Sequence, residues 1–303
     1  MNTRENRARA RGVSGSWWFP RLALLGLILT SCTPAPQPPP PPGDLPPEAP
    51  PQSNETLSSS DLDSVHRVVD GDTVDLVVDG ALQRVRLKGI NTPEKGECMA
   101  SEATSALSEL VAGGVRLTVT GHGDRGRLLG YLTDASGRLI QEELVERGLA
   151  LAYPYGDRDE FTDRLAQAQA RAEKAGRGQF AAEACGPAQV AKGLVRIVAM
   201  DANPSGDDLQ LGGGESVTIE GPAGLSLAGW TLKDTSASHR LRFGDDVILG
   251  VDGRLVVFSA CGTPERGRLY WCRKGSAIWN NSGDTAFLQD PHGNLMSTMN
   301  WSP

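Results

Sequence analysis

Five short segments of the chain contain residue types that could act on a phosphodiester. In chain order they are Asp70-Gly71-Asp72-Thr73, Arg86-Leu87, Asn91-Thr92-Pro93-Glu94, Asp124-Arg125-Gly126-Arg127 and Tyr153-Pro154-Tyr155. Carboxylate and amide oxygens are ligands for hard cations, a fixed carboxylate can move a proton, and guanidinium groups pair with phosphate oxygens. The combination predicts the hydrolysis of phosphodiesters.

The order of the segments suggests a role for each group. Asp72 and Asn91 end neighbouring strand-like segments, so a meander could bring their oxygens to one cation. Glu94 follows a proline that stiffens the turn, and it could activate or position a water. Arg86 and Arg127 could bind the phosphate and offset its developing charge. Taken alone, Arg86 could belong to a solvated strand face, and Asp72 or Asn91 to a turn.

The hydrophobic pattern indicates the elements that must position these residues. Residues 64–90 alternate as strands do, with turn residues at Asp70-Gly71 and Asp79-Gly80. Two further strands are expected at 114–120 and 128–132, and three helices at 101–111, 139–149 and 160–175, the first of them capped by Ser101. This part is therefore expected to be a small β barrel or sheet that carries three helices.

The pattern changes after Gly186. Short β runs alternate with turn residues about every ten positions, and no helical stripe is present. These runs include residues 195–200, 216–220, 230–233 and 255–259. The pattern is typical of an all-β sandwich, so the chain is expected to be β-rich and to contain two folded domains.

The overall charge limits the class of function. The formal net charge is −7 and the isoelectric point is about 5.2. Proteins that coat nucleic acid without sequence preference usually present a basic face. The acidic chain argues against such a coat protein, but it is compatible with a metal-assisted nuclease whose positive charge is confined to one cleft.

The first residues have the pattern of a targeting segment. Several arginines precede a short apolar run at residues 22–30, which is too short to span a bilayer as a helix. The run ends at Leu29-Thr30-Ser31-Cys32, which resembles the bacterial lipobox, in which the cysteine is lipidated. We therefore expect a signal peptide at 1–31, export to the cell envelope, and a membrane anchor at Cys32. The alternative is an ordinary cleaved signal with a chance cysteine.

A proline-rich spacer and two disulfides are expected after the anchor. Residues 32–62 form the expected linker, which is stiff, extended and solvated. The four remaining cysteines allow three pairings, and an exported chain favours disulfides. Cys261 and Cys272 are close in sequence and are paired here, which leaves Cys98 with Cys185. The other pairings stay open, and no CxxC spacing or nearby histidine supports a zinc site.

Residues 63–187 resemble the thermonuclease family, whose staphylococcal-nuclease-like domains have the oligonucleotide-binding β-barrel fold. The matching segments are VVDGDTVDL, VRLKGINTPE, DRGRLLGYL, ELVERGLALAYPY and GRGQF, in the family's order. The resemblance implies Ca²⁺ bound through Asp72, Asn91 and the backbone carbonyl of Thr92. It implies that Glu94 acts on the water and that Arg86 and Arg127 bind the phosphate. It also implies that Tyr153 and Tyr155 contact the nucleotide, and that products carry 3′-phosphates.

Three positions depart from the family pattern. Asn91 stands where the family usually has aspartate, so calcium binding is expected to be weaker. The loop before Arg127 is one residue shorter than usual and lacks an aromatic residue, which could change the direction of Arg127. Phe180 replaces the customary tryptophan, a change that a core is expected to tolerate.

Residues 190–303 resemble the lamin-tail domain, an immunoglobulin-like β sandwich. The matching segments are LAGWTLKD at residues 227–234 and IWNNSGDTAFLQD at 278–290. Trp230 and Trp279 lie in strand-like apolar runs and are expected in the core. The sequence does not indicate what this domain binds.

These features together predict an exported, lipid-anchored, calcium-dependent endonuclease that cleaves DNA and RNA with little sequence specificity. The alternative is a catalytically weak or inactive module that binds nucleic acid or acts as an envelope scaffold, as Asn91 and the short loop would favour. A third interpretation is an adhesive envelope protein in which the C-terminal domain carries the function.

Overall fold

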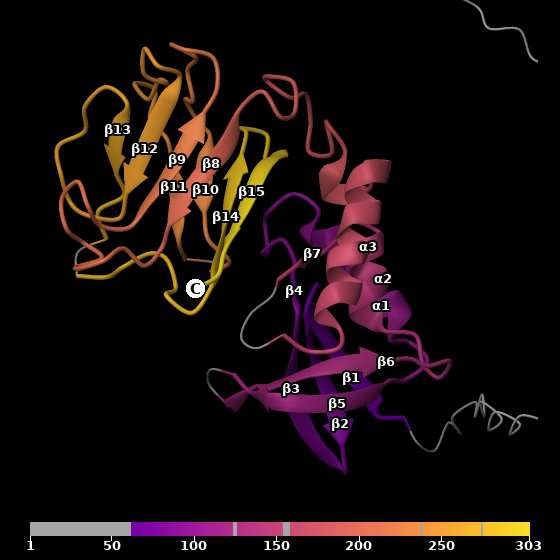
Figure 1. Cartoon of the computed structure of the whole chain (residues 1–303). Coiled ribbons are helices and arrows are strands. Elements are labelled where there is room, and N and C mark those ends of the chain that lie inside the picture. Colours follow the sequence, from indigo (N-terminus) through magenta and orange to yellow (C-terminus); the bar gives the residue numbers. More distant parts are fainter. Residues whose placement is uncertain (1–61, 124–125, 154–157, 237, 274) are drawn as a thin grey trace, which may run out of the picture. The chain divides into compact units, whose positions relative to one another are not determined.

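The structure is a computed structural model that describes residues 62–123, 126–153, 158–236, 238–273 and 275–303. All of these residues belong to one compact unit, Asn54–Pro303. The unit contains two large hydrophobic cores, one built from residues of the N-terminal half and one from residues of the C-terminal half. Two domains are visible, a sheet with helices and a β sandwich (Figure 1).

The N-terminal domain is built on a five-stranded sheet with the order β1-β2-β3-β6-β5. The strands are β1 Ser64–Asp70, β2 Thr73–Val78, β3 Ala81–Leu87, β5 Arg116–His122 and β6 Leu128–Thr133. Val74 and Leu76 on β2 alternate toward the core with Val85 and Leu87 on β3, as a period of two requires. An isolated bridge joins Asp63 to Val115, just before the two edge strands. The family resemblance implies a closed barrel, and closure of this sheet stays a prediction.

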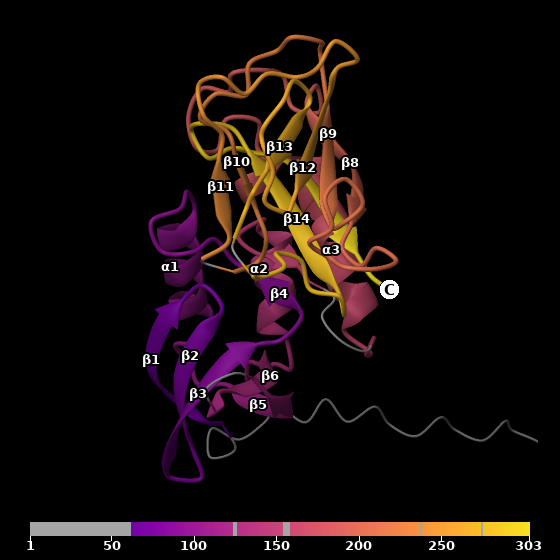
Figure 2. The same cartoon turned by 90° about the vertical axis from the view of Figure 1, so that its left-hand side faces the viewer.

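Three helices lie on this sheet, as the pattern predicts (Figure 2). They are α1 Ala100–Leu110, α2 Ile140–Glu146 and α3 Thr162–Ala175. The start of α1 differs from the expectation, because Met99 rather than Ser101 precedes the helix and has a left-handed backbone with φ 67°. The Ser101 hydroxyl instead donates to Glu102 Oε2 at 2.8 Å. A left-handed methionine is unfavourable, so the surrounding contacts must hold this loop in place.

A second, very short sheet positions two of the predicted site residues. It pairs β4 Ile90–Asn91 with β7 Leu151–Ala152 in antiparallel register. The Tyr153 amide then donates to the Gly89 carbonyl at 2.8 Å. Segments that are distant in sequence are thereby placed side by side, which the hydrophobic pattern alone did not predict.

The C-terminal domain is a sandwich of two four-stranded sheets, β11-β10-β14-β15 and β13-β12-β9-β8. Its strands are β8 Arg196–Asp201, β9 Ser216–Glu220, β10 Thr231–Lys233, β11 Arg240–Arg242, β12 Arg254–Phe258, β13 Arg268–Tyr270, β14 Asp284–Gln289 and β15 Leu295–Trp301. Trp230 and Trp279 are both buried in its core. A disulfide joins Cys261 to Cys272, the pairing favoured by their separation in sequence.

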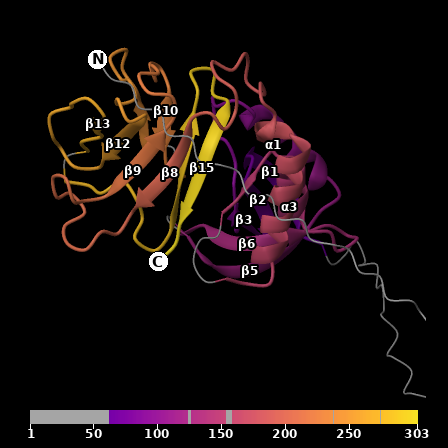
Figure 3. The same ribbon diagram turned by 45° about the horizontal axis from the view of Figure 1, so that its top comes forward.

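The two domains are in apolar contact, and a disulfide ties the loop before α1 to the segment that leads into the sandwich. Cys98 forms a disulfide with Cys185, which is the other favoured pair. A third apolar cluster combines Ala172 of α3 and Phe180 with Phe287 and Leu295 of the sandwich. Figure 3 shows β15 as the strand of the sandwich nearest to α3. In the part of the chain that the structure describes, no helix is long and apolar enough to cross a membrane.

Candidate active site

Asp72 and Arg86 form the centre of the site. Asp72 lies in the turn between β1 and β2, and Arg86 lies on β3 opposite Thr73. The Arg86 guanidinium forms an ion pair with Asp72 Oδ1, and its Nη2 donates to Asn91 Oδ1 at 3.2 Å. One arginine therefore bridges the carboxylate and the amide that the sequence assigns to a cation.

Thr92 fixes the other oxygen of Asp72. Its backbone N–H and its hydroxyl donate to Asp72 Oδ2 at 3.0 and 2.9 Å. Asp72, Asn91 and Thr92 are each at most 5% exposed. The three predicted cation ligands thus come together in one small, buried cluster.

The charges of the other segments act on Arg86. Burial lowers the pKa of Arg86 to about 10, while the charges of Asp70 and Glu94 raise it and that of Arg127 lowers it further. Tyr153 also acts on the same guanidinium. The structure therefore brings Glu94, Arg127 and Tyr153 within electrostatic range of Arg86.

Asp70 is a site residue for which the sequence analysis proposed no role. Its Oδ1 accepts the backbone N–H of Asp72 at 3.1 Å, and its charge raises the pKa of Arg86. The signal was present, since Asp70 opens the same four-residue segment as Asp72.

The loop after Glu94 contains a second carboxylate that the sequence did not single out. The Glu94 N–H donates to Glu97 Oε2 at 2.8 Å, and Glu97 Oε1 accepts Lys233 Nζ at 2.6 Å. Arg240 forms an ion pair with the same Oε1. Lys233 and Arg240 come from β10 and β11 of the sandwich, and no spacing in the sequence connects them with Glu97.

The donor chemistry fits a hard cation with one condition. The cluster offers a carboxylate and an amide oxygen, which Ca²⁺ prefers, and both already attract the positive charge of Arg86. Arg86 would have to release these oxygens for an ion to bind them. Among the described residues, no three His, Cys, Asp or Glu side chains gather in a metal-binding group.

A cavity of about 190 Å³ lies beside Tyr153. Its lining includes Lys88, Tyr131, Asp159 and Asn300. Asp159 Oδ2 accepts both the Lys88 ammonium and the Tyr131 hydroxyl at 2.8 Å. Asn300 belongs to β15, so the sandwich contributes to the wall of this cavity.

Some predicted residues lie outside the described part of the chain. They are Tyr155, Asp124, Arg125 and the lipidation candidate Cys32. Arg127 and Tyr153, at the edges of two of these gaps, are described.

The chain thus has two domains, and in the first of them Arg86 contacts the oxygens of Asp72 and Asn91. Each domain matches a known family. The family described as Staphylococcal nuclease homologue matches residues 84–181, and the Lamin Tail Domain matches residues 188–303. An uncharacterized endonuclease of Escherichia coli O157:H7 is 33% identical over 113 residues, which cover 37% of this chain and 73% of the relative. The chain belongs to the staphylococcal nuclease family and carries a lamin tail domain.

Other relatives match a smaller share of their own length. Endonuclease YncB of Bacillus subtilis strain 168 is 32% identical over 124 residues, which cover 37% of this chain and 58% of that protein. Micrococcal nuclease of Shigella flexneri is 35% identical over 100 residues, which cover 30% of this chain and 58% of that protein. The chain therefore matches less than two thirds of the length of these two relatives.

Proposed function

We propose that this protein is an exported, lipid-anchored, calcium-dependent endonuclease that cleaves DNA and RNA with little sequence specificity. The observation that carries the proposal is the convergence of Asp72, Asn91, Glu94 and Arg127 around the Arg86 guanidinium. Family membership and relatives named endonucleases support the same chemistry. The acidic net charge fits an enzyme that confines its positive charge to one site.

The chain's own residues divide the work of hydrolysis. Arg86 and Arg127 bind the non-bridging phosphate oxygens and stabilise the negative charge that grows as the bond breaks. Glu94 accepts a proton from the attacking water and directs the water oxygen at phosphorus. Tyr153 presents an aromatic face on which a base can stack, beside the cavity lined by Lys88 and Asn300.

Calcium would be held by Asp72, Asn91 and the Thr92 carbonyl. When bound there, it supplies positive charge to the phosphate and the leaving oxygen. Arg86 then has a second role, because it neutralises Asp72 until it turns to the phosphate.

The contact between Arg86 and Asp72 also favours a second candidate function. If calcium does not displace the arginine, the site holds nucleic acid without cleaving it, and the protein is a binding or scaffold module. Asn91 adds weight to this candidate, because the cluster has one negative charge fewer than the family usually has.

The test is hydrolysis of single-stranded DNA and of RNA by the full-length chain, with calcium and then with chelator. Calcium-dependent cleavage is expected, and Glu94→Gln should reduce the rate by about 100-fold or more because proton transfer is lost. Glu102→Gln is the matched control, since Glu102 is an exposed carboxylate on the nearby helix α1. Binding without cleavage at every calcium concentration would favour the second candidate.

Export and anchoring form a separate part of the proposal. Cys32→Ser should move the protein from the membrane fraction to the soluble exported fraction without changing its intrinsic activity. A variant that stays in the membrane fraction would contradict lipidation at Cys32.

A further inference from the structure

The turn that carries Glu94 is closed by Glu97. The Glu94 N–H donates to Glu97 Oε2, and the Glu97 N–H donates to the Glu94 carbonyl, each at 2.8 Å. The position of the Glu94 backbone therefore depends on the Glu97 carboxylate.

The Glu97 carboxylate is in turn held by the C-terminal domain. Lys233 Nζ donates to its Oε1 at 2.6 Å, and the Lys233 and Glu97 side chains are 4% and 6% exposed. Arg240 adds a second cation to the same oxygen from a more exposed position. A buried carboxylate that loses its partner is left with an uncompensated charge, so this pair constrains the geometry strongly.

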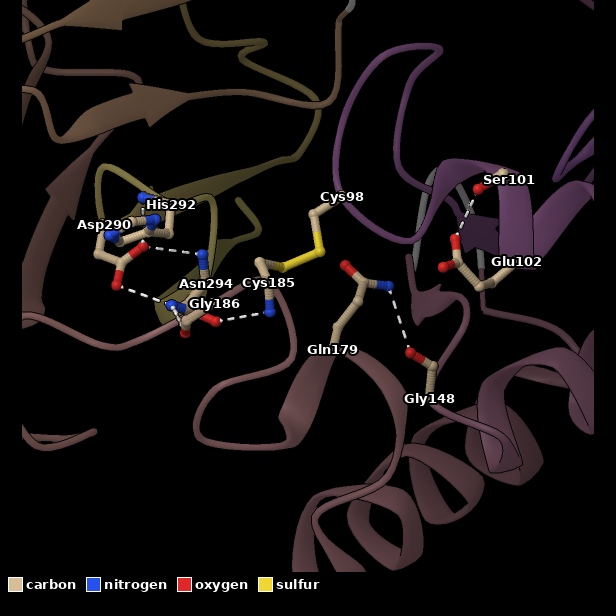
Figure 4. The surroundings of a disulfide bond; sticks show 10 residues. All are labelled: Cys98, Ser101, Glu102, Gly148, Gln179, Cys185, Gly186, Asp290, His292 and Asn294. Atoms are coloured by element: carbon tan, nitrogen blue, oxygen red, sulfur yellow. Dashed lines mark hydrogen bonds between the residues drawn. A yellow bond between two sulfur atoms is a disulfide. The ribbon is translucent and has the colours of Figure 1, made fainter.

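The next residue of the loop is connected to the same domain through a disulfide partner that lies just before that domain. Cys98 is bonded to Cys185, whose N–H donates to Asn294 Oδ1 at 2.9 Å. Asn294 is held by Asp290, to which its Nδ2 donates at 2.8 Å (Figure 4). The β10 strand and the turn between β14 and β15 thus hold two adjacent residues of one loop.

We propose that Lys233 is a positioning residue of the nuclease site, and that the lamin tail domain is therefore a working part of that site. Lys233 fixes Glu97, and Glu97 fixes the backbone from which the Glu94 carboxylate projects. Burial lowers the pKa of Lys233 to about 8, and the charge of Glu94 acts against that lowering. The inference rests on the proposed function for its catalytic consequence, but its structural part can be tested independently.

The alternative is that Lys233 only stabilises the contact between the domains. The two roles differ in their effect on turnover, because a carboxylate displaced by about 1 Å can lower the rate by about 100-fold while substrate still binds. A purely structural lysine would change the melting temperature but not the kcat of the folded protein.

Lys192 provides a matched control for Lys233. Both ammonium groups lie 5.6 Å from a phenylalanine ring centre, Lys192 over Phe180 and Lys233 over Phe287. Lys192 donates to the Phe180 carbonyl rather than to the Glu94 turn. Lys192→Met therefore removes a lysine that lies over a phenylalanine ring, but is more exposed than Lys233, without touching the loop.

The experiment measures kcat and KM for single-stranded DNA with calcium, using the full-length wild-type chain, Lys233→Met, Lys233→Arg and Lys192→Met. Lys233→Met should lower kcat by about tenfold or more and change KM by less than about threefold. Lys233→Arg should restore part of kcat, and Lys192→Met should leave it unchanged. If Lys233→Met does not fold, Arg240→Gln removes the other cation that holds the Glu97 carboxylate. It should give a smaller loss of kcat, again with little change in KM.

Amide hydrogen exchange across residues 94–98 separates this inference from the proposed function. Lys233→Met should speed exchange at these amides, whereas Lys192→Met should not. Unchanged kcat together with unchanged exchange would overturn the inference and leave the nuclease proposal standing. A wild-type chain that cleaves nothing would overturn the nuclease proposal, and exchange alone would then decide whether Lys233 fixes the loop.

Discussion

Buried carboxylates are used differently in the two domains. In the nuclease domain, Asp75 is held by Arg84 and Arg67, and hydrogen bonds from these arginines lower its pKa to about 2. In the sandwich, burial raises the pKa of Asp284 to about 6 and also raises the pKa of Glu215. Asp75 is paired with cations, whereas Asp284 and Glu215 accept backbone N–H groups.

The difference follows from what each carboxylate holds in place. Asp75 orders two arginines that are about half exposed, Arg67 on β1 and Arg84 on β3. Asp284 accepts the N–H groups of Asn280 and Thr285, so it fixes the backbone before and at the start of β14. Asp75 therefore orders charged side chains at the surface of the nuclease domain, whereas Asp284 holds backbone segments of the sandwich in place. Glu97 is an exception, because its cations come from the other domain.

The largest effect is expected at Glu215, which has no exposed surface. Its Oε2 accepts the N–H groups of Ile278 and Trp279 at 2.9 and 3.4 Å. Glu215→Ala leaves two buried donors without a partner and opens a cavity, so the free energy of unfolding should fall by about 2–5 kcal/mol. Urea denaturation monitored by tryptophan fluorescence measures the change.

Glu215→Gln separates the amide bonds from the charge. The glutamine keeps an acceptor oxygen and removes a charge whose burial is unfavourable. The free energy of unfolding should therefore stay within about 1 kcal/mol of the wild-type value. A glutamine variant as unstable as the alanine variant would show that the charge itself matters, and the contrast between the domains would fail.

A smaller effect is expected at Asp75, whose pKa is lowered by its arginines whereas burial raises that of Glu215. Because its pKa in the folded protein lies below the ordinary value of 3.8, ionised Asp75 stabilises the fold above pH 4. This stabilisation is lost as the pH falls from about 4 through about 2. Asp75→Asn should lower the free energy of unfolding at pH 7 by about 1–2 kcal/mol, allowing for the exposure of both arginines, and should converge with wild type in acid.

Glu146 is the control for Asp75. It also receives two half-exposed arginines, Arg171 and Arg177, but the Glu146 side chain is 24% exposed whereas that of Asp75 is 5% exposed. Glu146→Gln should change the free energy of unfolding by less than about 1 kcal/mol. Equal effects at Asp75 and Glu146 would mean that burial of the carboxylate does not set the strength of these pairs.

The sequence predicted the local elements well because their signals are local. Alternation placed β2 and β3, the stripe containing Leu165 and Ala168 placed α3, and short apolar runs placed β9 and β12. Met99 shows where this fails, since a left-handed residue at a helix start is imposed by tertiary contacts rather than by propensity.

The candidate site divides in the same way. Asp72, Asn91 and Arg86 were predicted together because one strand meander carries all three. Lys233 could not be predicted, because it meets Glu97 only when the sandwich packs beside the loop, across 136 positions of sequence. Contacts of that kind depend on how the two domains pack against each other, and no hydrophobic periodicity or sequence motif predicts them.

The prediction at Asp284 tests the contrast most directly, through the sign of its pH dependence. Its pKa is raised above the ordinary value, so folding is favoured when Asp284 is protonated, and that advantage is lost as the pH rises from about 4 through about 6. Asparagine does not titrate, so the stability of Asp284→Asn relative to wild type should increase by about 2 kcal/mol between pH 4 and pH 8. Thermal unfolding of both proteins across this range gives the difference, and titrations elsewhere cancel in the comparison. Asp75→Asn should instead lose relative stability as the pH rises from about 2 to about 4, so a common direction for the two variants would remove the distinction between the domains.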